Sequence, residues 1–252
     1  MRFSQPLVRG RLLRRYKRFL ADIELDGGEI VTAHCANPGS MLGLKDPGIS
    51  AWLSKSDNPK RKLAWSLEVV EVNAGRGPTL IGINTGHPNR LVEDAITAGA
   101  IPELAGYETL RREVKYGKNS RIDLLLSNDG TPDCYVEVKN VHLVREPGLA
   151  EFPDSVTARG AKHLDELSDM VKQGARAAMF YLIQRGDTER VMIARDIDPA
   201  YGEALDRARK AGVEVVACGC EVTAEGIEVT GALPCSHQST SRQNLVAFAR
   251  HH

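Results

Sequence analysis

The chain has 252 residues, of which 42% are hydrophobic and 26% are charged, a composition typical of a soluble globular protein. The N-terminus lacks the apolar core of a signal peptide, and no apolar run approaches the roughly 18 residues of a membrane span, so we expect a cytoplasmic protein without a membrane partner. The five cysteines are odd in number and lack paired C-x-x-C spacing, which indicates neither a disulfide framework nor a zinc site.

The formal net charge is zero, but the charges are unevenly distributed. Residues 1–121 hold 19 Lys and Arg against 13 Asp and Glu, whereas residues 122–252 hold 14 against 20. Basic clusters of this kind are typical of nucleic-acid binding, and a solvated charged face is the alternative. The candidate DNA contacts in the first half form two groups: Arg11, Arg14, Arg15, Lys17 and Arg18, and then Lys60, Arg61 and Lys62.

Residues 1–84 are predicted to form an all-β domain. Turn residues such as Asp26-Gly27-Gly28 separate six short segments with strand-like composition. Such a set of strands is typical of a small barrel, and a basic barrel suggests an OB-fold that grips nucleic acid, although a sandwich or an SH3-like barrel fits the same periodicity. The predicted strands are Leu7–Arg14, Arg18–Leu25, Glu29–His34, Ile49–Lys55, Leu63–Val72 and Thr79–Ile83.

Residues 85–234 are predicted to form an α/β domain, because strand-like and helical segments alternate along them. A loop is expected through Pro147, Gly148 and Pro153, and residues 235–252 are expected to be a loosely held tail. The predicted helices are Asn89–Ala100, Thr157–Gln173 and Pro199–Ala211. The predicted strands are Leu110–Tyr116, Arg121–Ser127, Cys134–Asn140, Ala177–Gln184 and Val213–Cys218.

The central hairpin carries two carboxylates that the sequence predicts to be close together. A turn centred on Gly130 places Asp123 roughly opposite Glu137, and alternation assigns Ile122 and Leu124 to the other face of the first strand. Like charges that are directly opposed repel, so this pair needs a positive neighbour. Lys139 could neutralise part of the negative charge of this pair, and Mg²⁺ would neutralise it better. The alternative is a carboxylate–lysine cluster on a solvated sheet face.

The pattern D-x13-E-V-K resembles the signature of the PD-(D/E)xK nuclease superfamily, although Ile122 stands where the proline would be. The resemblance implies that Asp123, Glu137 and Lys139 are catalytic and that Asp123 and Glu137 hold a metal ion. It also implies a third acidic ligand on the preceding helix, for which Glu93 is the candidate and Asp94 the alternative. Additional basic residues near this centre are candidate DNA contacts: Arg112, Lys115, Arg121, Lys162 and His163.

Several longer segments resemble the sugar fermentation stimulation protein A (SfsA) family. They include HCANPGSMLGL at 34–44, INTGHPNRLVEDAI at 83–96, CYVEVKNVHLV at 134–144 and FPDSVTARGAKHLDEL at 152–167. The match runs from about residue 1 to residue 230, in order along the chain. It implies an N-terminal OB-fold, a C-terminal PD-(D/E)xK restriction-endonuclease-like α/β domain, and DNA binding.

Three functions follow as hypotheses. The first is a DNA nuclease that uses Mg²⁺ or Mn²⁺ to cleave phosphodiesters. The second is a non-catalytic DNA-binding regulator of sugar (maltose) metabolism genes, and the third is a sugar-binding module. DNA is the expected partner, and a homodimer is left open beside a monomer.

Overall fold

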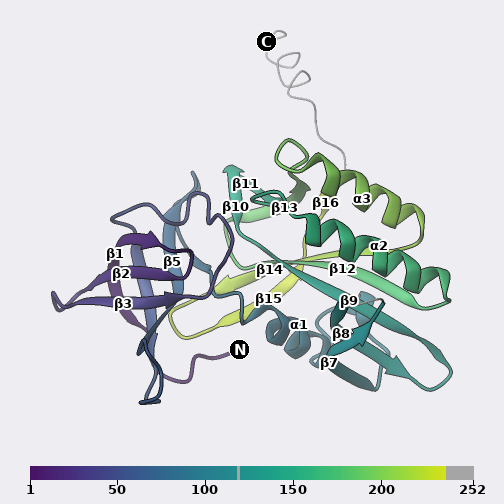
Figure 1. The fold of residues 1–252 in the computed structure, drawn as a ribbon, viewed down its shortest axis with the longest axis horizontal. Helices are drawn as coiled ribbons and strands as arrows, with labels where there is room; N and C mark the ends of the chain where they lie inside the picture. Colours follow the sequence, from purple (N-terminus) through teal and green to yellow (C-terminus); the bar gives the residue numbers. More distant parts are fainter. Residues whose placement is uncertain (118–119, 237–252) are drawn as a thin grey trace, which may run out of the picture.

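The computed structural model describes residues 1–117 and 120–236 and has two parts (Figure 1). An N-terminal barrel lies on the left of the view, and a sheet-rich α/β part with three α-helices lies on the right. The predicted fold class, a β-barrel followed by an α/β part, is confirmed. In the described ranges, no helix combines the length and the apolar character needed to cross a bilayer.

The barrel part has six strands in the order β3-β2-β1-β4-β5-β6. A parallel pairing of β3 with β5 closes the first five into a barrel, and β6 pairs with β5 alone within this sheet. Buried and partly exposed residues alternate strictly along β2, as expected for a strand with one face in a core. Each predicted strand overlaps an observed one. The strands are β1 (Val8–Tyr16), β2 (Leu20–Leu25), β3 (Ile30–Cys35), β4 (Ser50–Lys55), β5 (Trp65–Asn73) and β6 (Pro78–Gly82).

The α/β part is built on a six-stranded sheet in the order β15-β14-β12-β9-β8-β7. The central strand β12 (Arg176–Ile183) is parallel to both neighbours and almost continuously apolar, because both of its faces are buried. The other strands are β7 (Thr109–Tyr116), β8 (Ser120–Asn128), β9 (Thr131–Val141), β14 (Glu214–Val222) and β15 (Ile227–Ala232).

Helices cover the two faces of this sheet (Figure 1), and the sheet separates two apolar cores, one under the helices on each face. Helix α1 (Pro88–Thr97) packs on one face, whereas α2 (Ala158–Lys172) and α3 (Pro199–Lys210) pack on the other. The Thr157 hydroxyl caps α2 by accepting a hydrogen bond from the Gly160 amide at 3.1 Å, and Asp198 caps α3.

A second, four-stranded sheet contradicts one sequence-based prediction. The expected loop after residue 144 is instead the antiparallel pair β10 (Leu143–Glu146) and β11 (Gly148–Phe152), and β11 pairs in parallel with β13 (Thr188–Ile193). Cys235–Ser236, assigned to the tail, form β16 beside β13. Residues 237–252, the rest of that predicted tail, lie outside the described residues.

Backbone hydrogen bonds join the barrel to the α/β part. Ile81 of β6 forms an antiparallel bridge with Arg185, and the Gly82 amide donates to the Gln184 carbonyl at 3.0 Å. Gly82 is required by this close approach, since a Cβ atom there would lie 2.6 Å from Gln184 Oε1. The two parts are therefore connected by shared strand-like pairing as well as by the linker.

The buried carboxylate of Glu68 on β5 lies at the same junction. It accepts hydrogen bonds from Ser54 Oγ at 2.6 Å and Asn84 Nδ2 at 2.7 Å, and it lies 2.8 Å from Nε2 of His87, the residue before α1. Burial by itself raises the pKa of Glu68, but these hydrogen bonds outweigh burial and hold the pKa below its ordinary value. The ionised carboxylate thus ties the barrel to the start of α1.

We expect Glu68→Gln to lower the free energy of unfolding at pH 7 by about 1–3 kcal/mol, because the charged acceptor is lost. Since the pKa of Glu68 is lowered in the folded state, its contribution is present at neutral pH and disappears as the pH falls through that lowered value. Urea titrations at pH 7 and pH 3 measure the difference. Glu71→Gln, a half-exposed carboxylate on the same strand, is the control, and an equal loss in both variants would contradict the assignment.

Candidate active site

The hairpin of β8 and β9 brings Asp123 and Glu137 together. Leu124 pairs with Val136 and Leu125 with Tyr135, so the same register brings Asp123 next to Glu137. The predicted register of the hairpin is confirmed over its paired part. Both carboxylates lie where the ladder of hydrogen-bonded strand pairs ends.

The predicted alternation of faces on β8 is wrong at one residue. Ile122 and Leu125 belong to the core under α2, whereas Leu124 belongs to the core under α1, so alternation breaks at Asp123. On the neighbouring strand β7, Glu113 adopts a left-handed conformation with φ of 54°, and the ladder pairs only the residues on either side of it. Non-glycine residues rarely adopt this conformation, and such strain often marks functional sites.

The Asp123 carboxylate is held from two sides. Oδ1 accepts a hydrogen bond from Asn89 Nδ2 on α1 at 2.9 Å, and Oδ2 accepts one from the Val138 amide at 2.8 Å. Burial and the nearby negative charge of Glu137 nevertheless raise the pKa of Asp123 to about 6. Nothing in the sequence pointed to Asn89 beyond its place in the first turn of the helix.

The Glu137 carboxylate is almost completely buried and asymmetrically bonded. Oε1 accepts a hydrogen bond from Lys139 Nζ at 2.6 Å and a short one from His163 Nδ1 of α2. Burial favours a raised pKa, but these hydrogen bonds and the charge of Lys139 outweigh it, so the pKa of Glu137 lies below its ordinary value. Oε2 has no hydrogen-bond partner among the described residues.

His163 supports Glu137 and does not face solvent. Arg159 Nε donates to His163 Nε2 at 3.3 Å, so Nδ1 carries the proton that His163 donates to Glu137. The imidazole is buried, which corrects the expectation that His163 contacts a phosphate directly. Its spacing on α2 was visible in the sequence, but its contact with β9 depends on how the helix packs.

The residues fit a divalent cation, although in the described ranges no three His, Cys, Asp or Glu side chains are grouped as a ready metal site. Glu137 Oε2 is a buried carboxylate oxygen without a donor, and a cation would offset the repulsion that raises the pKa of Asp123. Hard carboxylate oxygens are the donors that Mg²⁺ and Mn²⁺ prefer. Asp123 and Glu137 would hold the ion, with solvent supplying further ligands.

Glu93, the predicted third ligand, is engaged elsewhere. It lies one turn after Asn89 on α1, and its carboxylate forms a 3.4 Å ion pair with Arg112 of β7. Its neighbour Asp94 lies 3.8 Å from Arg90. Arg112, predicted to contact DNA, is therefore paired with an acid as well.

A second buried acid near this centre was missed in the sequence. Glu166 follows His163 by one turn of α2, and neither of its oxygens has a hydrogen-bond partner among the described residues. Its charge and that of Glu137, together with burial, raise the pKa of Tyr116 well above its ordinary value. Lys162, a predicted DNA contact, forms a 3.5 Å ion pair with Glu166.

Several predicted DNA contacts on the barrel are occupied by other groups. Arg11 and Arg14 form cross-strand ion pairs with Glu24 and Asp22 of β2. Arg15 Nη2 donates to three backbone carbonyls, those of Arg18, Asn37 and Gly39, so it supports the loop after β3. These pairings reduce the basic surface that the composition suggests.

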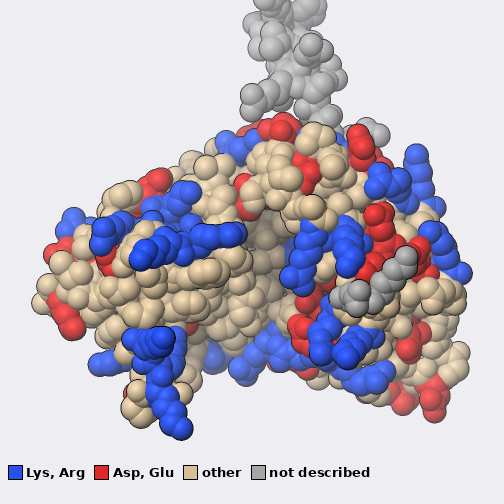
Figure 2. All heavy atoms as spheres, in the orientation of Figure 1, with Lys and Arg blue, Asp and Glu red and all other residues tan. Residues whose placement is uncertain are grey.

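Other predicted DNA contacts remain accessible, and Figure 2 shows Lys and Arg on both sides of the hollow between the two parts. Arg18 donates to the Pro38 carbonyl, Arg61 to the Ser66 hydroxyl and Arg121 to the Glu113 carbonyl, so their charges are not neutralised by acids in these contacts. Among the predicted contacts, four exposed lysines have neither an ion pair nor a side-chain hydrogen bond with the described residues: Lys17, Lys60, Lys62 and Lys115.

Comparisons with known proteins agree on one family. A family model described as the SfsA N-terminal OB domain matches residues 13–83, and one described as the sugar fermentation stimulation protein RE domain matches residues 86–226. A sugar fermentation stimulation protein homolog of Azorhizobium caulinodans is 58% identical over 93% of this chain and 99% of its own length. A homolog of the same name from Brucella ovis is 57% identical over 93% of this chain and 97% of its own length.

A solved structure agrees with these matches. It is described as Pyrococcus furiosus SfsA in complex with Ca²⁺, and it aligns with a TM-score of 0.83 and 27% identity over 94% of this chain and 98% of its own chain. The barrel, the sheet and the order of the two parts are thus those of this relative. The chain belongs to the sugar fermentation stimulation protein (SfsA) family.

Proposed function

We propose that this protein binds DNA and hydrolyses its phosphodiester bonds with a divalent cation held by Asp123 and Glu137. The observation that carries the proposal is the buried oxygen of Glu137 without a hydrogen-bond partner, beside Asp123, whose pKa burial and the charge of Glu137 raise to about 6. The P. furiosus relative was solved with Ca²⁺, a cation that often occupies carboxylate sites of this kind.

Each residue of the centre has a separate task in this proposal. Asn89 and the Val138 amide orient Asp123, and His163 holds Oε1 of Glu137, which leaves Oε2 for the cation. When bound, the cation polarises the scissile phosphate and lowers the pKa of a bound water. Lys139 lies against Glu137 and would neutralise charge that develops on the phosphoryl oxygens.

The accessible lysines on the barrel and on β7 would hold the DNA backbone. They are spread over Lys17 at the β1–β2 turn, Lys60 and Lys62 in the β4–β5 loop, and Lys115 on β7. Contacts of this type position the backbone without reading sequence. Figure 2 shows Lys and Arg on both sides of the hollow between the two parts, which supports DNA binding across it.

The test is incubation of the purified chain with plasmid, branched and single-stranded DNA in Mg²⁺ or Mn²⁺. We expect at least one substrate to be cut with either metal and none in EDTA. DNA binding without cleavage under every condition would favour the non-catalytic regulator. Cleavage that is unaffected by EDTA would contradict the metal site.

A further inference from the structure

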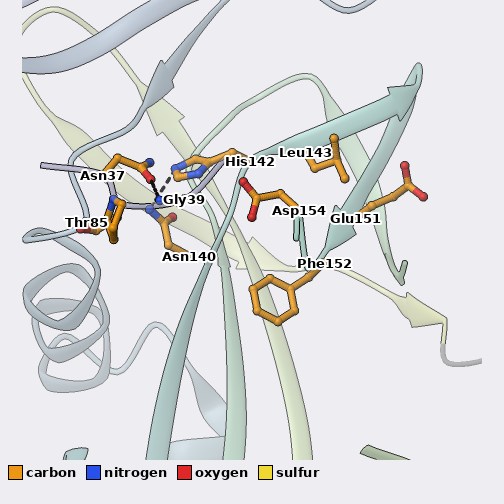
Figure 3. A pocket seen from close by; sticks show the side chains of 10 residues that line it. Asn37, Gly39, Thr85, Asn140, His142, Leu143, Glu151, Phe152 and Asp154 are labelled. Atoms are coloured by element: carbon orange, nitrogen blue, oxygen red, sulfur yellow. Dashed lines mark hydrogen bonds between the residues drawn. The ribbon is translucent and has the colours of Figure 1, made fainter. Parts of the chain in front are cut away.

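A cavity of about 150 Å³ lies between the barrel and the α/β part (Figure 3). Four segments line it: the loop after β3, the linker before α1, the end of β9 with the start of β10, and the end of β11 with the residues that follow. Its place at the junction means that neither part alone forms it. A volume of this size suits one ring-sized group and is too small for a drug-sized ligand.

The polar atoms of the cavity offer acceptors. His142 Nε2 lies 2.8 Å from the Gly82 carbonyl oxygen and 2.9 Å from Asn140 Nδ2. A carbonyl oxygen can only accept, so Nε2 carries the proton and Asn140 Nδ2 does not donate to it. Burial lowers the pKa of His142 to about 4, so the ring is neutral and Nδ1 is a free acceptor at neutral pH. Figure 3 shows the Asp154 carboxylate directed toward this imidazole and the Asn140 amide.

Apart from Asn140 Nδ2, the side-chain amide and hydroxyl donors that line the cavity already have protein partners. Asn37 Nδ2 donates to the Ile83 carbonyl at 2.9 Å, and the Thr85 hydroxyl donates to the Ala36 carbonyl at 2.7 Å. Ser40 Oγ and the Met41 amide donate to Asp154 Oδ2, which leaves Oδ1 with a single 3.3 Å contact to the Ser155 hydroxyl. A ligand would therefore meet acceptors in His142 and Asp154, and it must supply the donors itself.

The charge of the cavity disfavours a phosphate. No lysine or arginine is among the described residues that line it, and the second lining carboxylate, Glu151, is paired with Arg145. A sugar ring fits less well, because each hydroxyl seeks an acceptor and a donor together. An amino group conjugated to a planar ring only donates, and the apolar lining from Pro38, Leu143 and Phe152 suits the faces of such a ring.

The cavity also lies close to the acidic centre along one strand. Asn140 directly follows Lys139 and lies three positions after Glu137 on β9, a distance of about 10 Å along the strand. A nucleotide one or two positions from a phosphate at Glu137 could span that distance. Arg15 holds the carbonyls of Asn37 and Gly39, so the barrel side of the cavity is braced.

We propose that this cavity binds one unpaired nucleobase that carries an exocyclic amino group, with Asp154 and His142 accepting from that group. The inference deepens the proposed DNA function and rests on it for the source of the base. The amino groups of cytosine, adenine or guanine satisfy the free acceptors, whereas uracil and thymine present a carbonyl oxygen at the corresponding position. Repulsion between that oxygen and the Asp154 carboxylate would exclude them.

Fluorescence anisotropy with labelled single strands tests the inference. Oligomers of deoxycytidine and of deoxyuridine, each of about eight nucleotides, differ in the amino or carbonyl group at position 4 and in N3, which is an acceptor in cytosine and carries a hydrogen in uracil. They are compared in EDTA, so that cleavage plays no part. We expect the deoxycytidine strand to bind about ten-fold more tightly or better, since a hydrogen bond to a charged acceptor is gained.

Two variants locate the preference. Asp154→Asn is expected to abolish it and to leave the affinity for the deoxyuridine strand unchanged. Thr85→Trp fills the cavity from an exposed position, so it is also expected to abolish the preference for the deoxycytidine strand. It serves as the second variant if Asp154→Asn impairs folding. Asp169→Asn, an exposed carboxylate on α2 outside the cavity, is the control and should retain the preference.

Calorimetry with free deoxycytidine identifies the source of the base. Saturable binding of deoxycytidine that Thr85→Trp removes would show that a free nucleoside suffices. If the protein prefers the deoxycytidine strand but does not bind the free nucleoside, the base must belong to a strand. Equal affinity for both strands, with salt-dependent binding intact, would overturn the inference and leave the proposed DNA function standing. A preference that survives in both variants, or maltose displacing the deoxycytidine strand, would also overturn it. Failure of every strand to bind would overturn both.

Discussion

Asp123→Asn is expected to abolish cleavage of DNA and at the same time to stabilise the metal-free fold by about 1–3 kcal/mol. The pKa of Asp123 is raised from 3.8 to about 6, so its ionisation in the folded state costs free energy that a neutral amide avoids. This destabilisation develops as the pH rises from about 4 to 6 and is complete above that. Urea titration at pH 7 in EDTA measures the gain.

Measurements of metal binding and of cleavage distinguish the two metal ligands from the lysine. Calorimetry should show Mg²⁺ or Mn²⁺ binding that falls by at least about 100-fold in Asp123→Asn and in Glu137→Gln. Lys139→Ala should bind the metal nearly normally and yet cleave about 10²–10³-fold more slowly. Asp129→Asn, at the exposed tip of the same hairpin, should match the wild type. Unchanged metal affinity in both carboxylate variants would rule out this site.

Replacing Lys17, Lys60 and Lys62 with alanine is expected to weaken duplex DNA binding by about 10²-fold near 0.1 M salt, without regard to sequence. Each phosphate contact releases counterions, so the slope of log affinity against log salt should flatten by about 0.9 for each lysine removed. These three lysines lack ionic partners among the described residues, so their charges are free to meet phosphates. Filter binding or anisotropy over a series of salt concentrations measures both quantities.

The control for this prediction is Arg11→Ala with Arg14→Ala. These arginines lie on the same barrel, but Glu24 and Asp22 neutralise them, so we expect a much smaller change in slope. Because long side chains also contribute packing, thermal melts must first confirm that each variant is folded. If the arginine pair flattened the slope and the lysines did not, the assignment of the binding surface would be reversed.

Local patterns predicted most of the fold. The six barrel strands, the three helices and the register of the central hairpin follow from alternation, turn residues and caps, which act over a few residues. The small sheet was missed, because β10 and β11 are short and surround Pro147 and Gly148, residues that normally indicate a loop. Its strands are stabilised by pairing with β13, about 40 residues later in the sequence, a partner that no local pattern reveals.

The sequence predicted that the acidic residues of the candidate site lie close together, but it did not predict the residues that hold them in place. The spacing of Asp123, Glu137 and Lys139 along one hairpin is a local property, whereas Asn89 and His163 approach it from helices on opposite sides of the sheet. The ion pairs of Arg11 and Arg14 could have been foreseen. Pairing β1 with β2 about the turn places Arg14 opposite Asp22 and Arg11 opposite Glu24, so the hairpin itself cancels much of the basic run.

The bridge between Ile81 and Arg185 fixes the distance between the barrel and the acidic centre of the α/β part. A barrel attached only by a flexible linker would swing, and any DNA that it gripped would reach the acids at varying positions. Here the last strand of the barrel shares backbone hydrogen bonds with the turn after β12, and β12 lies directly beside the strand that carries Glu137. A strand anchored on the barrel would therefore reach Asp123 and Glu137 at a constant number of nucleotides from its anchor.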